Sequence, residues 1–233
     1  MVAFSKDNLL VFVGQRPDAH YIIMDQNQLS ALIQQDSFPL FEHESGSSEF
    51  EDLIRKVMTE YIHFDASFLA AVHAETAGHP FLTVKVMINF FDWLIESKRP
   101  LRNIHLGEGD FQLFASRRLN PIQIALNSGY DFFRKAVGDA MSEEGRKHTP
   151  WLHAVYAVMQ QISLEAESLR VSRSEYFELV QRINRPSLST YSPDGLLRTG
   201  TQANFFAFND ESVSIKIPTL ARISLAARRD IHW

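Results

Sequence analysis

The residues of this chain that are best suited to bind a metal ion are His73, Glu75 and His79, which lie within seven positions of one another. Imidazole and carboxylate groups are common zinc ligands, and helical zinc sites place them three or four residues apart, as in the H-E-x-x-H motif. That spacing is absent here. We therefore expect separate surface or capping histidines and predict no metal site.

The motifs of the common catalytic classes are absent from the sequence. It contains no G-x-S-x-G nucleophile elbow and no G-x-x-x-x-G-K-[ST] phosphate loop. Asp25 follows four apolar residues and imitates the acidic end of an ATPase metal-binding strand, but such a strand has no function without a phosphate loop. The single G-x-G at Gly107 and Gly109 lacks a third glycine and follows no predicted strand, so it indicates a turn. We predict no catalytic residues.

The Gly78-His79-Pro80 triplet stands directly before a long, very apolar segment. It either touches a ligand or joins two helices. Glycine favours the left-handed conformation that ends a helix, and proline fits the first position of the next helix because its φ is already set. Spacing alone therefore favours a helix–helix corner over a ligand site.

Length and composition restrict the class of protein. With 233 residues and 45% apolar content, the chain can form one large domain or two small ones. The formal charge of −5 gives no sign of a nucleic-acid or anionic-membrane partner. The absence of cysteine excludes disulfides, zinc ribbons and thiol catalysis. No apolar window reaches the length of a membrane span, so we expect a soluble, cytoplasmic protein without a membrane segment.

Hydrophobic periodicity predicts a mainly α (α+β) fold. A short strand over residues 8–15 is followed by helices over 50–61, 66–76 and 80–98, and by two or three more before residue 148. In the helix over 80–98 the polar residues form one narrow stripe, which predicts that this helix lies in the middle of a bundle with only the stripe exposed. The polar stripe consists of Lys85, Asn89, Asp92 and Glu96. We interpret residues 97–110 as a linker.

The last third of the chain has the order of elements of a winged helix. Thr149-Pro150, Ser172 with Glu175, and Ser192-Pro193 mark the starts of three helices, and Gly200 marks the end of the third. An aromatic strand, a turn at residues 209–210 and an alternating strand then predict a hairpin, which a final amphipathic helix over 219–229 follows.

A winged helix can insert its third helix into a DNA groove, but the charges disfavour that function here. From residue 148 to residue 233 there are nine Lys or Arg against eight Asp or Glu, a net charge of +1. The third helix offers Arg198 alone, beside Asp194, whereas a duplex reader shows a basic face. We therefore expect the wing to contact another protein or another part of this chain rather than nucleic acid.

The order of these segments resembles the C-terminal part of STAND-type NTPases, a branch of the AAA+-related P-loop ATPases with many bacterial signalling and defence members. "LLVFVGQR" is similar to the sensor strand of that family, with Arg16 at the sensor position. "ETAGHPFL" is similar to the glycine-x-proline motif of the helical lid, whose proline lies against adenine. The resemblance implies a nucleotide-binding role for Arg16, Gly78, His79 and Pro80.

The resemblance also implies a division of the chain into four parts. Residues 1–44 correspond to the edge of an α/β nucleotide-binding core, with a short β remnant, and residues 45–98 to a helical lid-like bundle. Residues 99–147 are a linker with connecting helices, and residues 148–233 form the winged-helix domain. The phosphate loop of the family lies upstream of the sensor strand, where this sequence has seven residues. We therefore expect weak binding of ATP or ADP with Mg²⁺, or none, and no hydrolysis.

The resemblance implies a regulatory function that couples the state of the nucleotide to domain packing and oligomerisation. The expected partners are an upstream P-loop core or other protein domains, and a second copy of the chain. Two alternatives remain open, a winged-helix DNA-binding regulator and a purely structural helical adaptor. In the adaptor, the Gly78-His79-Pro80 triplet only joins two helices.

Overall fold

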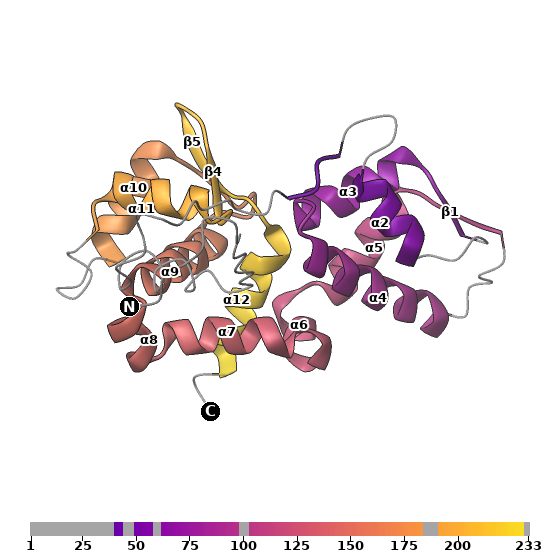
Figure 1. Ribbon diagram of the computed structural model, residues 1–233, viewed down its shortest axis with the longest axis horizontal. Coiled ribbons are helices and arrows are strands. Elements are labelled where there is room, and N and C mark those ends of the chain that lie inside the picture. Colours follow the sequence, from indigo (N-terminus) through magenta and orange to yellow (C-terminus); the bar gives the residue numbers. More distant parts are fainter. Residues whose placement is uncertain (1–39, 44–48, 58–61, 98–102, 184–190, 231–233) are drawn as a thin grey trace, which may run out of the picture. The chain divides into compact units, whose positions relative to one another are not determined.

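The structure is a computed structural model that describes residues 40–43, 49–57, 62–97, 103–183 and 191–230. By its contacts the chain divides between residues 36 and 37, and all the described residues belong to the second unit. The predicted strand over residues 8–15 and the sensor residue Arg16 lie outside the described residues. The described part is mainly helical with a few short strands, which confirms the predicted fold class (Figure 1).

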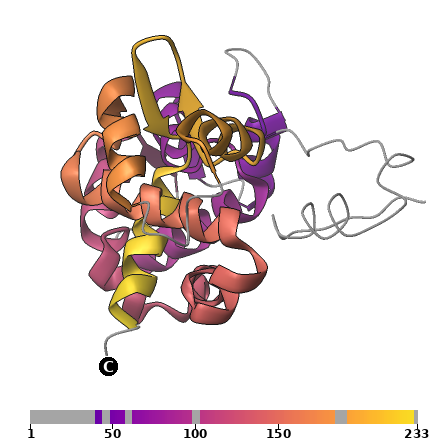
Figure 2. The ribbon, with the colours of Figure 1, turned by 90° about the vertical axis from the view of Figure 1, so that its left-hand side faces the viewer.

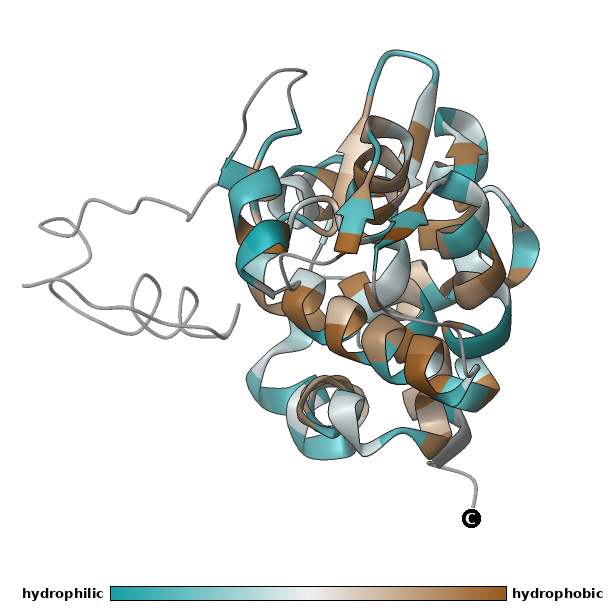
Figure 3. Ribbon diagram, turned by 90° about the vertical axis from the view of Figure 1, so that its right-hand side faces the viewer, coloured by the Kyte–Doolittle hydropathy of each residue, from teal (hydrophilic) through white to brown (hydrophobic). Residues whose placement is uncertain are grey.

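The first part of the unit contains three helices that the sequence predicts well. They are α2 (Glu49–Val57), α3 (Ala66–Thr76) and α4 (Pro80–Glu96). Asp65 caps α3 by accepting a hydrogen bond from the backbone N–H of Phe68 at 2.8 Å. Brown and teal segments alternate along the helical ribbons, as amphipathic helices require (Figure 3).

Two short parallel strands were not predicted. These are β1 (Ile62–Phe64) and β2 (Ile104–Leu106), with α3 and α4 in the connection between them. The interpretation of residues 97–110 as a linker was therefore wrong for the three residues of β2 and for residues 108–110, which begin a helix. The G-x-G prediction was also wrong, because Gly107 directly follows β2 and is the N-cap of α5 (Glu108–Arg118). Three-residue strands are too short to show a reliable period of two.

The environment of α4 differs from the prediction. One face of the helix is buried against the rest of the unit, but the opposite face exposes apolar side chains as well as polar ones. Asn89, which was expected to reach solvent, is half-buried and hydrogen-bonds to Asn127. The prediction of a helix in the middle of a bundle was therefore wrong, because periodicity identifies apolar positions without showing which neighbours cover them.

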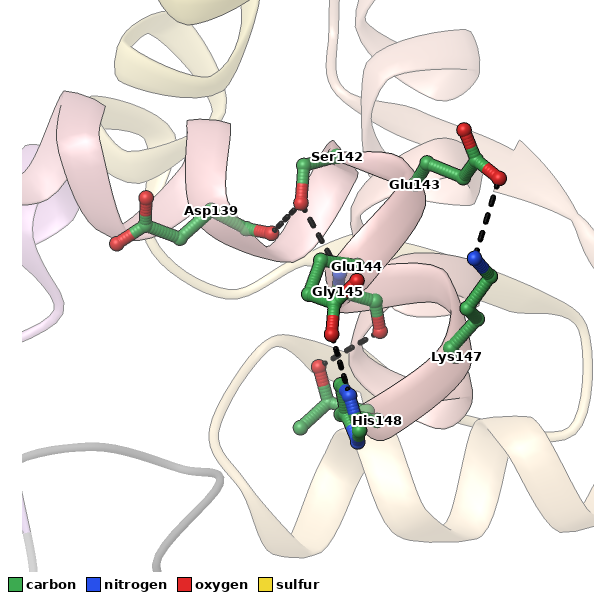
Figure 4. A network of polar contacts seen from close by, with 8 residues as sticks. Asp139, Ser142, Glu143, Glu144, Gly145, Lys147 and His148 are labelled. Atoms are coloured by element: carbon green, nitrogen blue, oxygen red, sulfur yellow. Dashed lines mark hydrogen bonds and ion pairs between the residues drawn. The ribbon is translucent and has the colours of Figure 1, made fainter.

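Short helices connect this part to the rest of the unit. They are α6 (Pro121–Leu126), the 3-10 turn η2 (Ser128–Tyr130), α7 (Asp131–Met141) and α8 (Glu143–His148). The corner between α7 and α8 requires glycine, because a Cβ at Gly145 would lie 2.1 Å from the carbonyl oxygen of Asp139. Ser142 caps α8 by accepting a hydrogen bond from the N–H of Gly145 (Figure 4).

The winged helix is formed by three helices and a three-stranded antiparallel sheet. The sheet has the strand order β3-β5-β4, so the last strand lies between the other two. The β4–β5 hairpin projects beyond the helices in both views (Figures 1 and 2). The elements are α9 (Pro150–Glu165), β3 (Arg170–Ser172), α10 (Arg173–Ile183), α11 (Pro193–Gln202), β4 (Phe206–Phe208) and β5 (Ser212–Ile215).

Several local signals of the winged helix are confirmed and one is wrong. Ser172 and Glu175 form the predicted capping box, with each side chain accepting from the other residue's backbone N–H. The hairpin turn is held by Asn209, whose side-chain oxygen accepts from the N–H of Ser212 at 2.8 Å. Gly200 does not end α11 but lies inside it, where a Cβ would approach the Phe206 ring to 2.4 Å. This glycine therefore allows α11 to pack closely on β4.

The final helix, α12 (Pro218–Asp230), has more neighbours than the prediction assigned to it. It packs on α9 of the winged helix and also on α3, α6 and α7. Small buried residues on α12, among them Ala221, Ala226 and Ala227, allow these helices to approach it closely. As a result, α12 connects the winged helix to α3, α6 and α7.

Candidate functional site: the corner between α3 and α4

The Gly78-His79-Pro80 triplet forms the corner between α3 and α4. Ala77 (φ 48°) and Gly78 (φ 69°) are both left-handed, which ends α3 as the sequence predicts. Gly78 is buried, and the N–H of Phe41 donates a hydrogen bond to its carbonyl oxygen at 3.1 Å. A Cβ at this position would lie 2.0 Å from the carbonyl oxygen of Phe41. Gly78 therefore shapes the corner and has no surface open to a ligand.

His79 caps the second helix of the corner. Its Nδ1 accepts a hydrogen bond from the N–H of Leu82 at 3.3 Å, so this nitrogen carries no proton when the cap is formed. The side chain is half-buried, and this burial lowers the pKa of His79 below its ordinary value. Its ring also meets Phe133 edge-on at 6.4 Å between centroids. At neutral pH the uncharged imidazole is thus available as a cap and as an apolar surface.

Pro80 is exposed and begins an aromatic patch, which we define as Phe81, Phe132 and Phe133. Phe81 lies 5.3 Å from Phe133 and 6.0 Å from Phe132, measured between ring centroids. Phe81 and Phe132 are 41% and 48% exposed. The Lys85 ammonium lies over the Phe81 ring at 5.5 Å, which adds a positive charge beside the patch. A flat, electron-rich ring could stack on this surface.

Two threonines fasten the inner side of the corner. The Thr83 hydroxyl donates to the Thr76 hydroxyl at 3.0 Å, and Thr76 in turn donates to the carbonyl oxygen of Val72 at 2.9 Å. Both threonines are fully buried. This chain of hydrogen bonds ties the last turn of α3 to the first turn of α4, so the two helix ends move together.

Glu75 joins this corner to the C-terminal helix. Its carboxylate lies 2.8 Å from the Arg222 guanidinium of α12 and accepts a hydrogen bond from the Thr219 hydroxyl at 2.9 Å. Only 8% of Glu75 is exposed. Burial raises the pKa of the Glu75 carboxyl, and the Arg222 charge opposes that rise. The sequence analysis missed this ion pair, although a glutamate in the apolar part of a helix was a signal for it.

The histidines and carboxylates near the corner do not converge on a metal. His73 shares a hydrogen bond with the carbonyl oxygen of Phe41 at 2.9 Å, His79 caps α4, and Glu75 binds α12. Among the described residues no group of three or more His, Asp or Glu side chains could hold a metal ion. The carboxylates and the histidine of α8 are likewise engaged in ion pairs. Glu143 pairs with Lys147 and Glu144 with His148, and all four side chains are exposed to solvent (Figure 4).

The helix starts beside β1 and β2 do not offer an anion site, because the chain's own carboxylates satisfy them. Asp65 caps α3. At the start of α5, Asp110 accepts from the N–H of Gly107 at 3.0 Å, and the Ser67 hydroxyl accepts from the N–H of Glu108 at 3.1 Å. The phosphate groups of a nucleotide would compete with these negative charges.

In the described part of the winged helix, acidic side chains lie among the basic ones on α11 and at the tip of the wing. Arg198 is exposed on α11, but Asp194 on the same helix pairs with Arg173 at 3.3 Å. The tip of the wing carries the exposed residues Asp210 and Glu211. Phosphate contacts by the wing would therefore meet negative charge.

Of the four residues predicted to bind nucleotide, the described structure brings three together. His79 and Pro80 share an accessible edge of the corner and Gly78 lies beneath it, whereas Arg16 lies outside the described residues. Two surface hollows occur elsewhere. One is lined largely by charged side chains of α9, β3 and α10, and the other contains Pro121 and Arg222. Neither hollow includes a residue of the triplet.

Searches for related proteins give no assignment. No family model, curated protein or solved structure matches this chain. Within the described residues, no helix combines the length and the apolar character that crossing a membrane requires.

Proposed function

We infer that this chain is the regulatory lid and winged-helix portion of a nucleotide-dependent signalling ATPase. It has no catalytic residues of its own and responds to ATP or ADP supplied with a P-loop core. The observation that carries the proposal is the position of Pro80. It is exposed beside the aromatic patch, five residues from Glu75, which binds Arg222 of the C-terminal helix.

The first step is recognition of the adenine ring. In the family that the sequence resembles, the lid proline lies against adenine, and Pro80 occupies that place in the motif. The rings of its neighbours Phe81 and His79 both lie close to Phe133 and extend the apolar surface. Stacking on such a surface needs no particular base edge, so the site would recognise a purine by shape more than by hydrogen bonds.

The second step is transmission to the winged helix. A ligand on Pro80 contacts a corner whose two helix ends are hydrogen-bonded through Thr76 and Thr83. The same corner holds α12 through Glu75. A ligand shifts such an arrangement only by its difference in affinity for the two states. Closure of the core on the lid would favour one packing of α12, and release of the nucleotide would favour the other.

The phosphate side of the site must come from elsewhere. The described residues near the triplet include Lys85 but no glycine-rich phosphate loop, and His79 itself caps the helix that starts there. Arg16, the sensor residue of the resemblance, would approach the phosphates in the assembled protein. This chain would therefore supply the surface that contacts adenine, and a P-loop core would hold the phosphates and Mg²⁺. Weak binding to the isolated chain is the consequence.

Thermal melting with millimolar ADP or ATP and Mg²⁺ tests the proposal. A ligand that binds only the folded state raises its stability by RT ln(1 + [L]/Kd), or about 2.7 kcal/mol at a hundredfold excess over Kd. We expect a smaller but reproducible rise in Tm for the wild type, and its loss in Pro80→Ala and Arg16→Ala. An unchanged Tm in a cooperatively melting wild-type chain would contradict nucleotide binding by this chain.

Pro193→Ala provides the matched control. Pro193 also occupies the first turn of a helix, α11, so both substitutions change the same backbone feature. The quantity to compare is the ligand-induced rise in Tm, because either substitution can change the Tm itself. We expect Pro193→Ala to keep the full rise.

A further inference from the structure

Three exposed apolar side chains form a row along α4. Phe81, Ile88 and Ile95 are 41%, 44% and 54% exposed. They are spaced seven residues apart, so each is displaced around the helix by only about 20° from the one before. Several large apolar side chains gathered on one exposed face mark an interaction surface more often than a single isolated one does.

A charged row runs beside the apolar one. On a helical projection Asp92 and Lys85 lie about 20° and 40° from Phe81, on the same side. Asp92 is exposed and has no hydrogen-bond or ion-pair partner among the described residues. Glu96 at the end of this side is already paired with Arg118. The two charged groups that remain on this side are the Lys85 ammonium and the Asp92 carboxylate, seven residues apart.

Both rows are symmetric about the same point. Ile88 is the centre of the apolar row, and the midpoint between Lys85 and Asp92 lies half a residue away. A two-fold axis beside Ile88 would place it against its own copy, and Phe81 against the partner's Ile95. The same operation would bring Lys85 to the partner's Asp92 and, reciprocally, Asp92 to the partner's Lys85.

Only an antiparallel pair of helices gives this match. When two antiparallel helices are related by a two-fold axis, that axis is perpendicular to the plane of the pair, so both charged rows lie on the same side of the contact. In a parallel pair the axis runs along the helices, and the two charged rows lie on opposite sides. Such an isologous contact is the usual basis of homodimers.

We propose that α4 is the surface through which two copies of this chain associate, as an antiparallel helix pair centred on Ile88. The occupant is a second copy because the surface complements itself in its apolar pattern and in charge. The helix has 17 residues and is therefore about 25 Å long. A pair of that length buries less than the roughly 1,200 Å² of a stable interface, so the dimer is weak and depends on concentration. The proposal does not depend on nucleotide binding.

Charge reversal tests the pairing by sedimentation velocity over a range of protein concentrations. We expect the wild type to dimerise, and Lys85→Glu and Asp92→Lys each to raise the dissociation constant at least tenfold, because each places like charges together twice. A mixture of the two variants forms a heterodimer with both pairs restored, and the double variant dimerises again. Lys56→Glu, at an exposed position on α2, is the control with the same change in charge.

Cysteine cross-linking tests the position of the axis. The chain has no cysteine, so a single introduced thiol reports without background. Ile88→Cys should form a disulfide-linked dimer on oxidation, because the two Cα atoms face each other at the axis. Phe81→Cys should not, since its own copy would lie about 21 Å away along the helix. Phe81→Cys mixed with Ile95→Cys should cross-link.

Three outcomes would overturn the proposal. The first is a wild-type chain that stays monomeric at all concentrations. The second is a dimer whose dissociation constant is unaffected by both charge reversals, which would place the interface elsewhere. The third is equal loss of dimer in Ile88→Ser and in Leu164→Ser, which changes an exposed apolar residue of α9. A specific interface on α4 requires the first variant to lose the dimer and the second to keep it.

Discussion

Glu75 of α3 and Arg222 of α12 form an ion pair in which only one partner is deeply buried. The side chain of Glu75 is 10% exposed and that of Arg222 is 31% exposed, with 2.8 Å between the charged atoms. The guanidinium can therefore reach water by a small movement, whereas the carboxylate cannot. Removing the arginine therefore leaves a buried carboxylate, whereas removing the glutamate leaves a guanidinium that water can reach.

We expect Arg222→Ala to destabilise the protein more than Glu75→Ala does. Without the arginine, the carboxylate stays buried and uncompensated, which costs on the order of 3 kcal/mol. Without the glutamate, Arg222 turns to solvent and the loss is about 1 kcal/mol. Urea denaturation of both variants measures the difference in free energy of unfolding. Equal losses would mean that α12 moves far enough to hydrate Glu75.

The raised pKa of Glu75 predicts a dependence of stability on pH. The folded state holds the Glu75 proton more tightly than the unfolded chain, whose pKa is near the ordinary 4.5. This group therefore stabilises the fold at low pH, and the contribution is lost as the pH rises from 4.5 through the raised pKa. Glu75→Gln removes the titration. The wild type should lose stability relative to Glu75→Gln across that interval, measured by urea denaturation at a series of pH values. A wild type that gains stability relative to Glu75→Gln as the pH rises would contradict the raised pKa.

Gly78→Ala should destabilise the corner by more than about 2 kcal/mol, because a left-handed alanine is strained. The added methyl group would also meet the carbonyl oxygen of Phe41. Gly109→Ala is the control. This glycine lies inside α5 with no heavy atom within 4 Å of a Cβ, so the substitution should stabilise the protein by about 0.5 kcal/mol. Similar Tm values for the two variants would contradict both the left-handed conformation of Gly78 and its close contact with Phe41.

His79 gives a second dependence on pH, of opposite sign. Its lowered pKa means that the unfolded chain binds the proton more tightly, so stability is lost as the pH falls from 6.5 through the folded-state pKa. Protonation also removes the acceptor that caps α4 at Leu82. Asparagine keeps a cap without titrating, so the wild type should lose stability below pH 6.5 relative to His79→Asn.

His153 provides the check on the origin of this effect. Its pKa is also lowered by burial, and it is unchanged in both proteins, so its contribution cancels in the comparison. Parallel stability curves for the wild type and His79→Asn would assign the acid sensitivity to His153 or to other groups.

The sequence predicts well those parts of the fold that local signals determine. The corner at Gly78 and the capping box of Ser172 and Glu175 follow from residue types within a few positions of each other. The hairpin turn at Asn209 belongs to the same class. Such motifs depend on backbone preferences that a single sequence displays directly.

The features that the sequence does not predict depend on partners far along the chain. Ile62 of β1 pairs with Ile104 of β2, and neither three-residue strand shows a recognisable pattern by itself. The Glu75 carboxylate hydrogen-bonds to Thr219, 144 positions away. Periodicity also cannot show that one face of α4 is left uncovered. In the candidate site, Pro80 was predicted, but the aromatic patch beside it was not, because Phe132 approaches only in the folded chain.

The hydrogen bond between Glu75 and Thr219 has a consequence for how the protein folds. Docking of α12 closes a loop of nearly 150 residues, and loop-closure entropy opposes contacts that are so distant in sequence. Folding is slower when such contacts dominate. During synthesis, α3, α6, α7 and α9 leave the ribosome long before α12 does. Until α12 docks, the apolar surfaces that it will cover are open to chaperones and to aggregation.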